Sequence, residues 1–340
     1  MNKASVTSLD VAKRAGVSQS AVSRVFTPGA SASAATVEKV REAARELGYR
    51  PNPIARAMIT GKSRIIGLVL AYLDNQFYPI ALQRLSTVLQ ERGYHVLVFM
   101  VQNTSDSVDE IVQDLLDYRV DGIVAASVAF RGELVDRCAD SGIPVVLFNR
   151  GQDGGGVSTV TSANVAGGAR VAEFLVGAGH ERIAHIAGWQ GSSTGRDRKR
   201  GFIDGLAQLE RSAVAVVDGM YDQEVASAAT LELFNNGPRP DAIFVGNDHM
   251  AFAVMDALRG KLGLSVPDDV SVVGYDDVPL ASWDAYDLTT VRQPVNQMVD
   301  ATVETLLAEI DSHDRPEQKI EIHGPLIVRG SARVPEGWPQ

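Results

Sequence analysis

From Arg64 onward, short apolar runs alternate with amphipathic segments, and few folds are compatible with this alternation. Continuous apolar runs are typical of parallel strands buried on both faces, and strand–helix–strand order places helices on each face of such a sheet. The strands and intervening helices predicted for the first series are residues 65–70, 80–92, 95–101, 108–118, 122–126, 133–140 and 145–148. We therefore expect an α/β fold built on a parallel sheet.

A glycine-rich run at residues 153–156 interrupts this series, and the same alternation then starts again. The elements predicted for the second series are residues 165–176, 183–187, 198–209, 213–217, 224–234, 242–245, 250–262 and 270–274, followed by a helix at 295–310 and short apolar runs at 320–323 and 326–328. Two such halves predict two doubly wound parallel sheets. Paired halves of this kind bind ligands in the cleft at the carboxyl ends of their strands.

Residues 7–26 predict two short helices joined by a tight turn. Thr7 is placed to cap the first helix, and Asp10 stands where the acid of a capping box stands. Gly16 is typical of a residue just after a helix, and Ser18 is placed to cap the second helix. Two short helices joined this closely cross steeply, which is the helix-turn-helix geometry.

The second of these helices divides into an apolar face and a polar face, and the polar face carries Gln19, Ser20, Ser23 and Arg24. Amide, hydroxyl and guanidinium groups near a helix N-terminus match the donors and acceptors in the major groove of DNA. The alternative is a solvated surface helix in an ordinary bundle. A third helix, capped near Ser33, completes a small three-helix head.

The charge of the chain is distributed unevenly. The whole chain carries a net charge of −10, which by itself argues against nucleic acid. Residues 1–64, however, hold 11 basic and 4 acidic side chains, whereas the remainder holds 21 basic and 38 acidic ones. A basic head on an acidic body is expected when only the head contacts phosphates.

Residues 51–62 connect the head to the body and predict a very short helix. Asn52 and Pro53 form a cap followed by proline at the first helical position, and Gly61 ends the segment. A helix of about eight residues is too short to be stable in isolation. We expect it to order only when a second copy or DNA supports it, and the alternative is a plain linker.

The single cysteine, Cys138, excludes an internal disulfide and favours a reducing compartment. The first residues lack the apolar core of a signal peptide, and no apolar run approaches the length of a membrane span. We therefore expect a cytoplasmic protein without a membrane partner.

Seven motifs follow one another along the chain: the helix pair at 7–26, Asn-Pro-Ile-Ala-Arg at 52–56, Gly-His-Glu-Arg-Ile-Ala at 179–184, Arg-Lys-Arg-Gly-Phe at 198–202, Val-Gly-Asn-Asp at 245–248, Val-Gly-Tyr-Asp-Asp at 273–277 and Leu-Thr-Thr-Val at 288–291. With these motifs in this order, the whole chain resembles the lactose repressor/galactose repressor (LacI/GalR) family of bacterial transcription regulators.

The resemblance implies a homodimer with two helix-turn-helix heads, a hinge helix after each head, and a two-lobed effector domain similar to periplasmic sugar-binding proteins. The implied domains are a head at 1–50, a hinge at 51–62 and an effector domain at 63–340. Its N-lobe would span about 63–161 and 292–323, and its C-lobe about 162–291 and 324–340.

The resemblance also assigns roles in DNA binding. Gln19, Ser20 and Arg24 stand where base-reading side chains usually lie, and Met58 replaces the leucine that usually wedges into the minor groove. The complete set of residues expected at the DNA is Thr7, Ser18, Gln19, Ser20, Ser23, Arg24, Ser33, Asn52, Ala55 and Met58.

Residue types alone point to an effector site. Asn247 and Asp276 follow predicted strands, and Arg150 and Arg198 lie in loops entering the same region. Carboxylate, amide and guanidinium groups suit a polyhydroxylated ligand, and Phe77, Tyr221 and Trp283 are candidate apolar faces. The resemblance places Arg198, Tyr221, Asn247, Asp276 and Gln293 at effector contacts, and Asn149 where many members have aspartate. The complete expected set is Phe77, Asn149, Arg150, Arg198, Tyr221, Asn247, Asp276 and Gln293.

Two other motifs suggest chemistry that we do not favour. Residues 191–195 match G-x-S-x-G, which would make Ser193 the nucleophile of an α/β hydrolase, but a nucleophile elbow requires the serine directly after the strand. His180 and His185 resemble a zinc-protease motif, yet their spacing of five does not place them on one helix face. We therefore expect no catalytic residue, no metal and no cofactor.

The favoured interpretation is a sequence-specific DNA-binding transcriptional regulator, expected to be a repressor, under allosteric control by a small metabolite such as a sugar. Its expected partners are double-stranded operator DNA, the effector and a second copy of the chain. The alternatives are the hydrolase using Ser193 and a small-molecule binding protein without a DNA function.

Overall fold

The structure is a computed structural model that describes residues 6–27, 30–50, 62–101, 111, 113–127, 132–152, 154–312 and 316–339. The chain divides into two compact units, Met1–Ser63 and Arg64–Gln340, which are described separately below.

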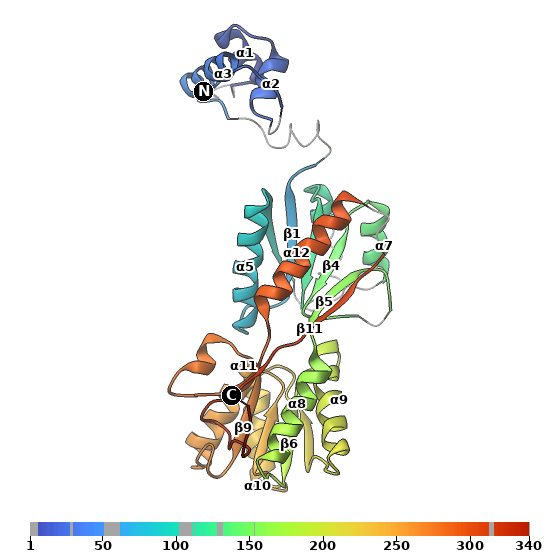
Figure 1. Cartoon of the computed structure of the whole chain (residues 1–340), viewed down its shortest axis with the longest axis vertical. Helices are drawn as coiled ribbons and strands as arrows, with labels where there is room; N and C mark the ends of the chain where they lie inside the picture. Colours follow the sequence, from blue (N-terminus) through green and yellow to red (C-terminus); the bar gives the residue numbers. More distant parts are fainter. Residues whose placement is uncertain are drawn as a thin grey trace. The chain divides into compact units, whose positions relative to one another are not determined.

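The described part of the first unit contains three helices (Figure 1), which pack around a small core. They are α1 (Ser8–Ala15), α2 (Gln19–Val25) and α3 (Ala34–Leu47). The core consists of the buried side chains that recur at helical spacing, namely Val11, Ala12, Val22, Val40, Ala43 and Ala44. The predicted helix-turn-helix head is confirmed.

The second unit contains two six-stranded sheets. The first has the strand order β11-β5-β4-β3-β1-β2, and all its described pairings are parallel. Its strands are β1 (Ile65–Leu70), β2 (His95–Met100), β3 (Gly122–Ala126), β4 (Val145–Phe148), β5 (Ser158–Ser162) and β11 (Lys319–Ile322).

Helices cover this sheet because its central strands are apolar on both faces. On one face, α5 (Phe77–Glu91) and α12 (Val295–Asp311) lie next to each other (Figure 1). They pack on side chains such as Leu68. On the other face, side chains such as Val69 join a separate apolar cluster with α7 (Gly132–Asp140).

The second sheet has the strand order β12-β10-β9-β8-β6-β7. Its strands are β6 (Ile183–Ala187), β7 (Ala215–Asp218), β8 (Ala242–Val245), β9 (Ser271–Asp276), β10 (Thr289–Arg292) and β12 (Leu326–Ile327). Strand β12 pairs antiparallel with β10, so this sheet is parallel except at that edge.

Helices again cover both faces of the second sheet. They are α8 (Asn164–Gly177), α9 (Ser193–Gln208), α10 (Gln223–Asn235) and α11 (Asp248–Asp256), with a π turn at Ala257–Lys261 and a 3-10 turn at Pro279–Ser282. Side chains of α8 and α9 share one apolar cluster, and side chains of α10 and α11 share another. The predicted α/β class with two doubly wound, mainly parallel sheets is confirmed.

Several element boundaries differ from the sequence-based expectation. Strands β5 and β10 were not predicted because their buried residues are mostly Ser and Thr rather than a continuous apolar run. Helix α9 begins at Ser193 instead of residue 198, because the Ser192 side chain caps it there. Of the helix predicted at 108–118, residues 108–110 and 112 lie outside the described part.

The chain passes between the two sheets three times, which makes each lobe discontinuous in sequence. The crossings lie between β5 and α8, between β10 and α12, and between β11 and β12. No described helix has both the length and the apolar composition needed to cross a membrane.

Candidate functional site

The turn between α1 and α2 is built by capping. The backbone N–H and the hydroxyl of Thr7 donate to the Asp10 carboxylate at 2.9 and 2.7 Å, while the Asp10 backbone N–H donates to the Thr7 hydroxyl at 3.4 Å. Gly16 has φ +68°, a left-handed conformation that L side chains avoid. Ser18 then caps α2 by accepting from the Ala21 backbone N–H at 3.2 Å.

Helix α2 presents the expected polar face to solvent. Gln19, Ser20, Ser23 and Arg24 are exposed, whereas Val22 is 1% exposed in the core. The Gln19 amide donates to the Ser8 hydroxyl at 2.9 Å, which ties the N-terminus of α2 to α1. The face can therefore offer side-chain donors and acceptors to a surface outside the head.

The other residues expected at the DNA fall into two groups. Thr7, Ser18 and Ser33 are N-caps, so their hydroxyls accept backbone N–H groups and hold the starts of the three helices. The remaining three, together with the hinge helix, lie outside the described residues: Asn52, Ala55 and Met58. The DNA-contact role of the whole set stays a prediction.

A cavity of about 500 Å³ lies between the two lobes of the second unit, at the carboxyl ends of both sheets. Six of the eight residues expected at the effector line it: Asn149, Arg150, Arg198, Tyr221, Asn247 and Asp276. They come from the segments that follow β4, β7 and β8, from α9 and from the end of β9. The structure thus brings them together, and their contact with an effector stays a prediction.

Sequence reasoning missed further residues of this cavity wall, which are Tyr72, Asp74, Asn75, Tyr78, Trp189, Thr194, Met220, Asp222 and His249. Most of them follow β1, β6, β7 or β8 by only a few residues. Position directly after a strand, the criterion that identified Asn247, would have found them as well.

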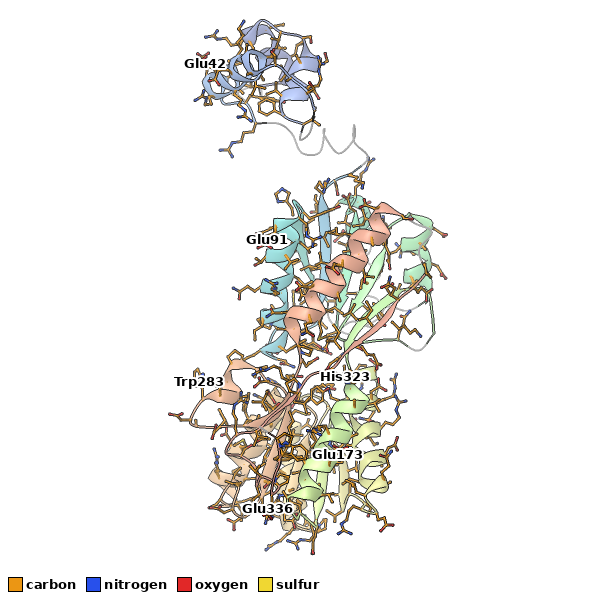
Figure 2. The ribbon with its side chains drawn as sticks, viewed as in Figure 1. Glu42, Glu91, Glu173, Trp283, His323 and Glu336 are labelled. Carbon is orange, nitrogen blue, oxygen red and sulfur yellow. The ribbon has the colours of Figure 1, made fainter. Side chains whose placement is uncertain are left out.

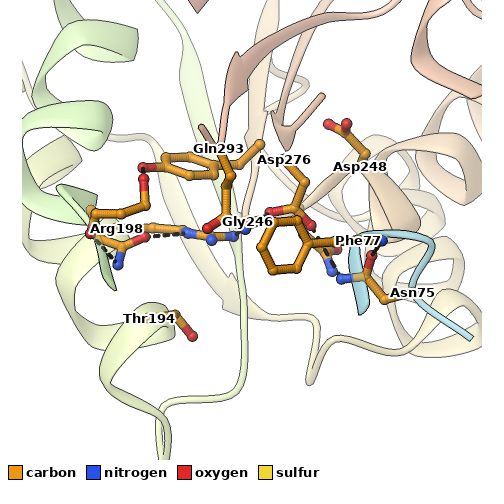
Figure 3. Close-up of polar contacts among 12 residues, drawn as sticks. Asn75, Phe77, Thr194, Arg198, Gly246, Asp248, Asp276 and Gln293 are labelled. Atoms are coloured by element: carbon orange, nitrogen blue, oxygen red, sulfur yellow. Dashed lines mark hydrogen bonds and ion pairs between the residues drawn. The ribbon is translucent and has the colours of Figure 1, made fainter. Parts of the chain in front are cut away.

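A buried ion pair forms the polar centre of the cavity wall (Figure 3). Arg198 Nη1 lies 3.3 Å from Asp276 Oδ1, and the two side chains are 3% and 2% exposed. Arg198 also donates to the Gly246 carbonyl at 2.7 Å and to Asn164 Oδ1 at 2.9 Å. Its guanidinium carbon lies 3.7 Å from the centroid of the Tyr275 ring.

The Asp276 carboxylate accepts two more hydrogen bonds. Gln293 Nε2 donates to Oδ1 at 2.7 Å, and Asn75 Nδ2 donates to Oδ2 at 3.1 Å from the other lobe (Figure 3). Burial raises the pKa of Asp276, and the nearby Arg198 charge opposes that shift. The network fixes charged and amide groups in place before any ligand is present.

A second carboxylate, that of Asp248, lies behind the wall. It is fully buried and accepts from the Thr290 hydroxyl at 2.6 Å and from the Val278 backbone N–H at 3.0 Å. Burial, with Asp276 nearby, raises the pKa of Asp248 to about 7. Its neighbour Asn247 caps α11 by accepting from the Met250 backbone N–H at 3.0 Å.

Two residues of the expected effector set do not line the cavity. Phe77 begins α5 and turns into the core, where its ring stacks on Phe148 at 6.1 Å between centroids. Gln293 is 3% exposed behind Asp276, so it positions that carboxylate instead of facing the cavity. Trp283, considered as an apolar face, is 61% exposed on the surface (Figure 2).

The G-x-S-x-G segment is not a strand-to-helix elbow. Strand β6 ends at Ala187, and Ser193 comes six residues later as the first residue of α9. The Ser193 hydroxyl accepts from the Gly151 backbone N–H at 2.9 Å, which links the two lobes.

The two candidate histidines are separated by their surroundings. His185 is buried in β6, where Nδ1–H donates to the Phe244 carbonyl at 2.9 Å and burial lowers its pKa to about 4. His180 precedes the strand and contacts Arg333 and Asp241 instead. Within the described part of the chain, no three His, Cys, Asp or Glu side chains are grouped to hold a metal ion.

Two family profiles match this chain. Residues 7–52 match the profile of bacterial regulatory proteins of the lacI family, and residues 172–332 match the periplasmic binding protein-like domain. The chain belongs to the lacI family. It is a DNA-binding transcriptional regulator with a helix-turn-helix head and a periplasmic binding protein-like effector domain.

Individual lacI-family proteins align over nearly their whole length. The HTH-type transcriptional repressor PurR of Vibrio atlanticus is 29% identical over 330 residues, covering 96% of this chain and 98% of the relative. The ribose operon repressor of Escherichia coli K12 is 29% identical over 331 residues, covering 95% and 98%.

Two solved structures extend the comparison to three dimensions. The lac repressor dimer bound to operator and the anti-inducer ONPF is 28% identical, with a TM-score of 0.85 over 96% of this chain and 99% of that chain. The regulator CelR in complex with cellobiose is 29% identical, with a TM-score of 0.73 over the same shares.

Proposed function

We propose that this protein is a cytoplasmic transcriptional repressor whose operator affinity is set by a polyhydroxylated small molecule bound in the cavity. The observation that carries the proposal is the Arg198–Asp276 pair, which is buried, hydrogen-bonded from both lobes and placed on the cavity wall. Burying two charges is costly unless they are well paired, so such a pair on a cavity wall favours a binding role.

The cavity chemistry supports a sugar as the ligand class. A guanidinium donates, a carboxylate accepts, and the amides of Asn149 and Asn247 do both, which suits a ring with several hydroxyls. Tyr221 and Trp189 add aromatic surface for the less polar faces of a sugar. Two similar proteins bear the names ribose operon repressor and CelR–cellobiose complex, which favours the same class.

A homodimer is part of the proposal. Strand β2 lies at the edge of its sheet and exposes Val98 and Met100, each 46% exposed, and nearby Tyr118 is 58% exposed. Exposed apolar side chains on an edge strand favour association with another chain. A dimer would place two α2 helices in successive major grooves, with Gln19, Ser20 and Arg24 as the base-reading residues.

Control would run through lobe closure. An effector held by side chains of both lobes would favour one spacing of the lobes, and this would change how well the two hinge segments pair on the operator. Coupling of this kind amounts to about 1–3 kcal/mol, or 5- to 150-fold in affinity.

The test is a selection of duplexes from a randomised DNA library by the full-length protein, followed by fluorescence anisotropy at 50 and 200 mM salt. We expect a recovered palindromic site to bind about 10³-fold or more tightly than a scrambled duplex, with affinity falling steeply as salt rises. Equal affinity for both duplexes would overturn the proposed DNA function.

We expect no hydrolase activity. The Ser193 hydroxyl is hydrogen-bonded to the Gly151 backbone and does not lie at an elbow, so it lacks the setting of an activated nucleophile. Turnover of p-nitrophenyl acetate that disappeared in Ser193→Ala would contradict this expectation.

A further inference from the structure

The cavity wall contains a second buried guanidinium, that of Arg150, whose charge is not balanced as the charge of Arg198 is. Arg150 is 7% exposed. It donates from Nη1 to the Ser127 carbonyl at 2.9 Å and from Nη2 to the Tyr72 hydroxyl at 3.2 Å. Both partners are neutral, and among the described residues no carboxylate lies within ion-pair distance of Arg150.

Arg198 shows what a balanced guanidinium looks like in the same cavity. It has a carboxylate 3.3 Å away and two further hydrogen-bond acceptors, and that carboxylate is itself held by two amides. Because this pair is complete, Arg198 and Asp276 together add no net charge to the cavity wall. Arg150 adds a positive charge that the described protein groups leave uncompensated.

Aromatic rings surround Arg150 and keep water away from its charge. The guanidinium carbon lies 5.7, 5.8 and 6.0 Å from the ring centroids of Tyr72, Trp189 and Tyr221. These distances allow cation–π attraction, which holds the guanidinium in place without neutralising it. A buried charge without a counter-charge is costly, so an anionic ligand would gain more here than in water.

Some N–H donors of Arg150 have no acceptor among the described residues. A guanidinium carries five N–H groups, and the two hydrogen bonds above use one N–H on each terminal nitrogen. Each terminal nitrogen keeps a second N–H, and Nε has no described partner. Two parallel N–H groups are the arrangement that a carboxylate accepts in a bidentate contact.

The acidic side chains of the cavity gather around a different residue. Asp74, Asp222 and Asp276 are the charges that act on His249, and Asp74 and Asp222 are exposed. Burial acts to lower the pKa of Arg150, and the neighbouring hydroxyls of Tyr78, Tyr72 and Tyr221 oppose that shift. Among the described residues the cavity is therefore polarised, with carboxylates near His249 and, at Arg150, a cation that no carboxylate pairs with.

We infer that the effector carries a carboxylate that pairs with Arg150, which makes its chemical class a sugar acid and not a neutral sugar. This inference rests on the proposed function, because it names the ligand class of the same cavity. A carboxylate fits better than a phosphate dianion, since one uncompensated cation matches one negative charge and no described lysine lines the cavity.

The experiment measures binding of matched ligands to the full-length protein by isothermal titration calorimetry, supported by thermal shift. The panel is D-glucose, D-gluconate, D-glucuronate and glucose 6-phosphate, with D-galactose, D-galacturonate and galactose 1-phosphate. We expect at least one acid to bind about 10-fold or more tightly than its neutral parent.

Variants assign that preference to Arg150. Arg150→Met should weaken binding of the acid by about 10- to 100-fold, a larger factor than that by which it weakens binding of the neutral parent sugar. Arg150→Lys keeps the positive charge but lacks the two parallel N–H groups of the guanidinium, so its affinity for the acid should lie between those of the wild type and Arg150→Met. It replaces Arg150→Met in the comparison if the methionine variant does not fold. Arg92→Met, which removes an exposed charge at the end of α5, is the matched control and should bind like the wild type.

The outcomes separate this inference from the proposed function. A neutral sugar or a sugar phosphate that binds as tightly as the matching acid, or an acid whose affinity is the same in Arg150→Met, would overturn the inference and leave a sugar-binding regulator in place. Absence of binding by every member of the panel would contradict the inference and the proposed ligand class together.

Discussion

At the scale of single residues, the Arg198–Asp276 pair dominates the energetics of the cavity. Both side chains are almost fully buried, so each charge depends on the other for the stabilisation that water would otherwise supply. Gln293, which does not line the cavity, belongs to the same network because it donates to the carboxylate from behind.

Arg198→Met should therefore lower the free energy of unfolding by about 3 kcal/mol, since it leaves the Asp276 carboxylate buried without its counter-charge. Urea unfolding followed by circular dichroism measures this. Arg292→Met is the matched control: Arg292 is 49% exposed, and its partner Asp277 keeps Arg329 at 2.6 Å. A loss no larger in Arg198→Met than in Arg292→Met would show that the buried pair is not an important stabilising contact.

His185 should make stability depend on pH. Its pKa is about 4 in the folded protein against 6.5 for an unperturbed histidine, so the unfolded chain binds more protons between these values. Above pH 6.5 the imidazole is neutral in both states and His185 does not lower the free energy of unfolding. As the pH falls from 6.5 toward 4, protonation of His185 in the unfolded chain lowers that free energy.

When the pH is lowered from 7.5 to 5, the free energy of unfolding should consequently fall by about 2 kcal/mol more in the wild type than in His185→Phe. The phenylalanine ring has a similar shape and can stack on Phe244 as the imidazole does, at 4.6 Å between centroids. Chemical denaturation at both pH values gives the difference. Parallel losses in the two proteins would mean that His185 does not titrate on unfolding.

Cavity residues were predictable where their position depends only on following a predicted strand of a parallel sheet. Asn247 and Asp276 lie where strand order places them, and Trp189 could have been found by the same argument. Phe77 was not predictable in this way. Helix α5 begins at Phe77, three residues before the start that its apolar pattern indicated, and the Phe77 ring packs in the core against Phe148.

At the scale of elements, the helix-turn-helix is the segment whose local sequence determines most. The caps at Thr7 and Ser18 and the left-handed Gly16 are each readable from residue type, and the structure has all three. Strands β5 and β10 show the opposite case. Their buried serines and threonines owe their positions to neighbouring strands, which a single-sequence pattern does not contain.

Arg24→Ala should lower affinity for the selected operator by about 10- to 100-fold while leaving affinity for a scrambled duplex within about threefold, because a base contact is lost. Lys39→Ala removes the same charge from an exposed position on α3 and should lower both affinities alike. Anisotropy with the two duplexes measures both. Equal losses for both duplexes in Arg24→Ala would assign that side chain to phosphates and not to bases.

At the scale of the whole molecule, the two lobes are joined by three crossings of the chain, and the proposed control requires a ligand to change the spacing of the lobes about them. Asn75 of one lobe donates to Asp276 of the other, and the Gly151 backbone N–H donates to Ser193, so polar contacts join the two lobes. Under the proposed function, a ligand that replaces or reinforces these contacts would change the equilibrium between open and closed lobes. The ligand can change operator affinity by no more than the ratio of its own affinities for the open and the closed lobes.

The most direct test of the account is operator affinity measured with and without a ligand that binds the cavity. Anisotropy of the selected operator is recorded for the full-length protein with the tightest ligand of the sugar and sugar-acid panel, at 100 times its dissociation constant. We predict a 5- to 150-fold change in operator affinity that disappears in Asp276→Asn. An operator affinity that stays constant although the ligand occupies the cavity would contradict the proposal that this cavity controls DNA binding.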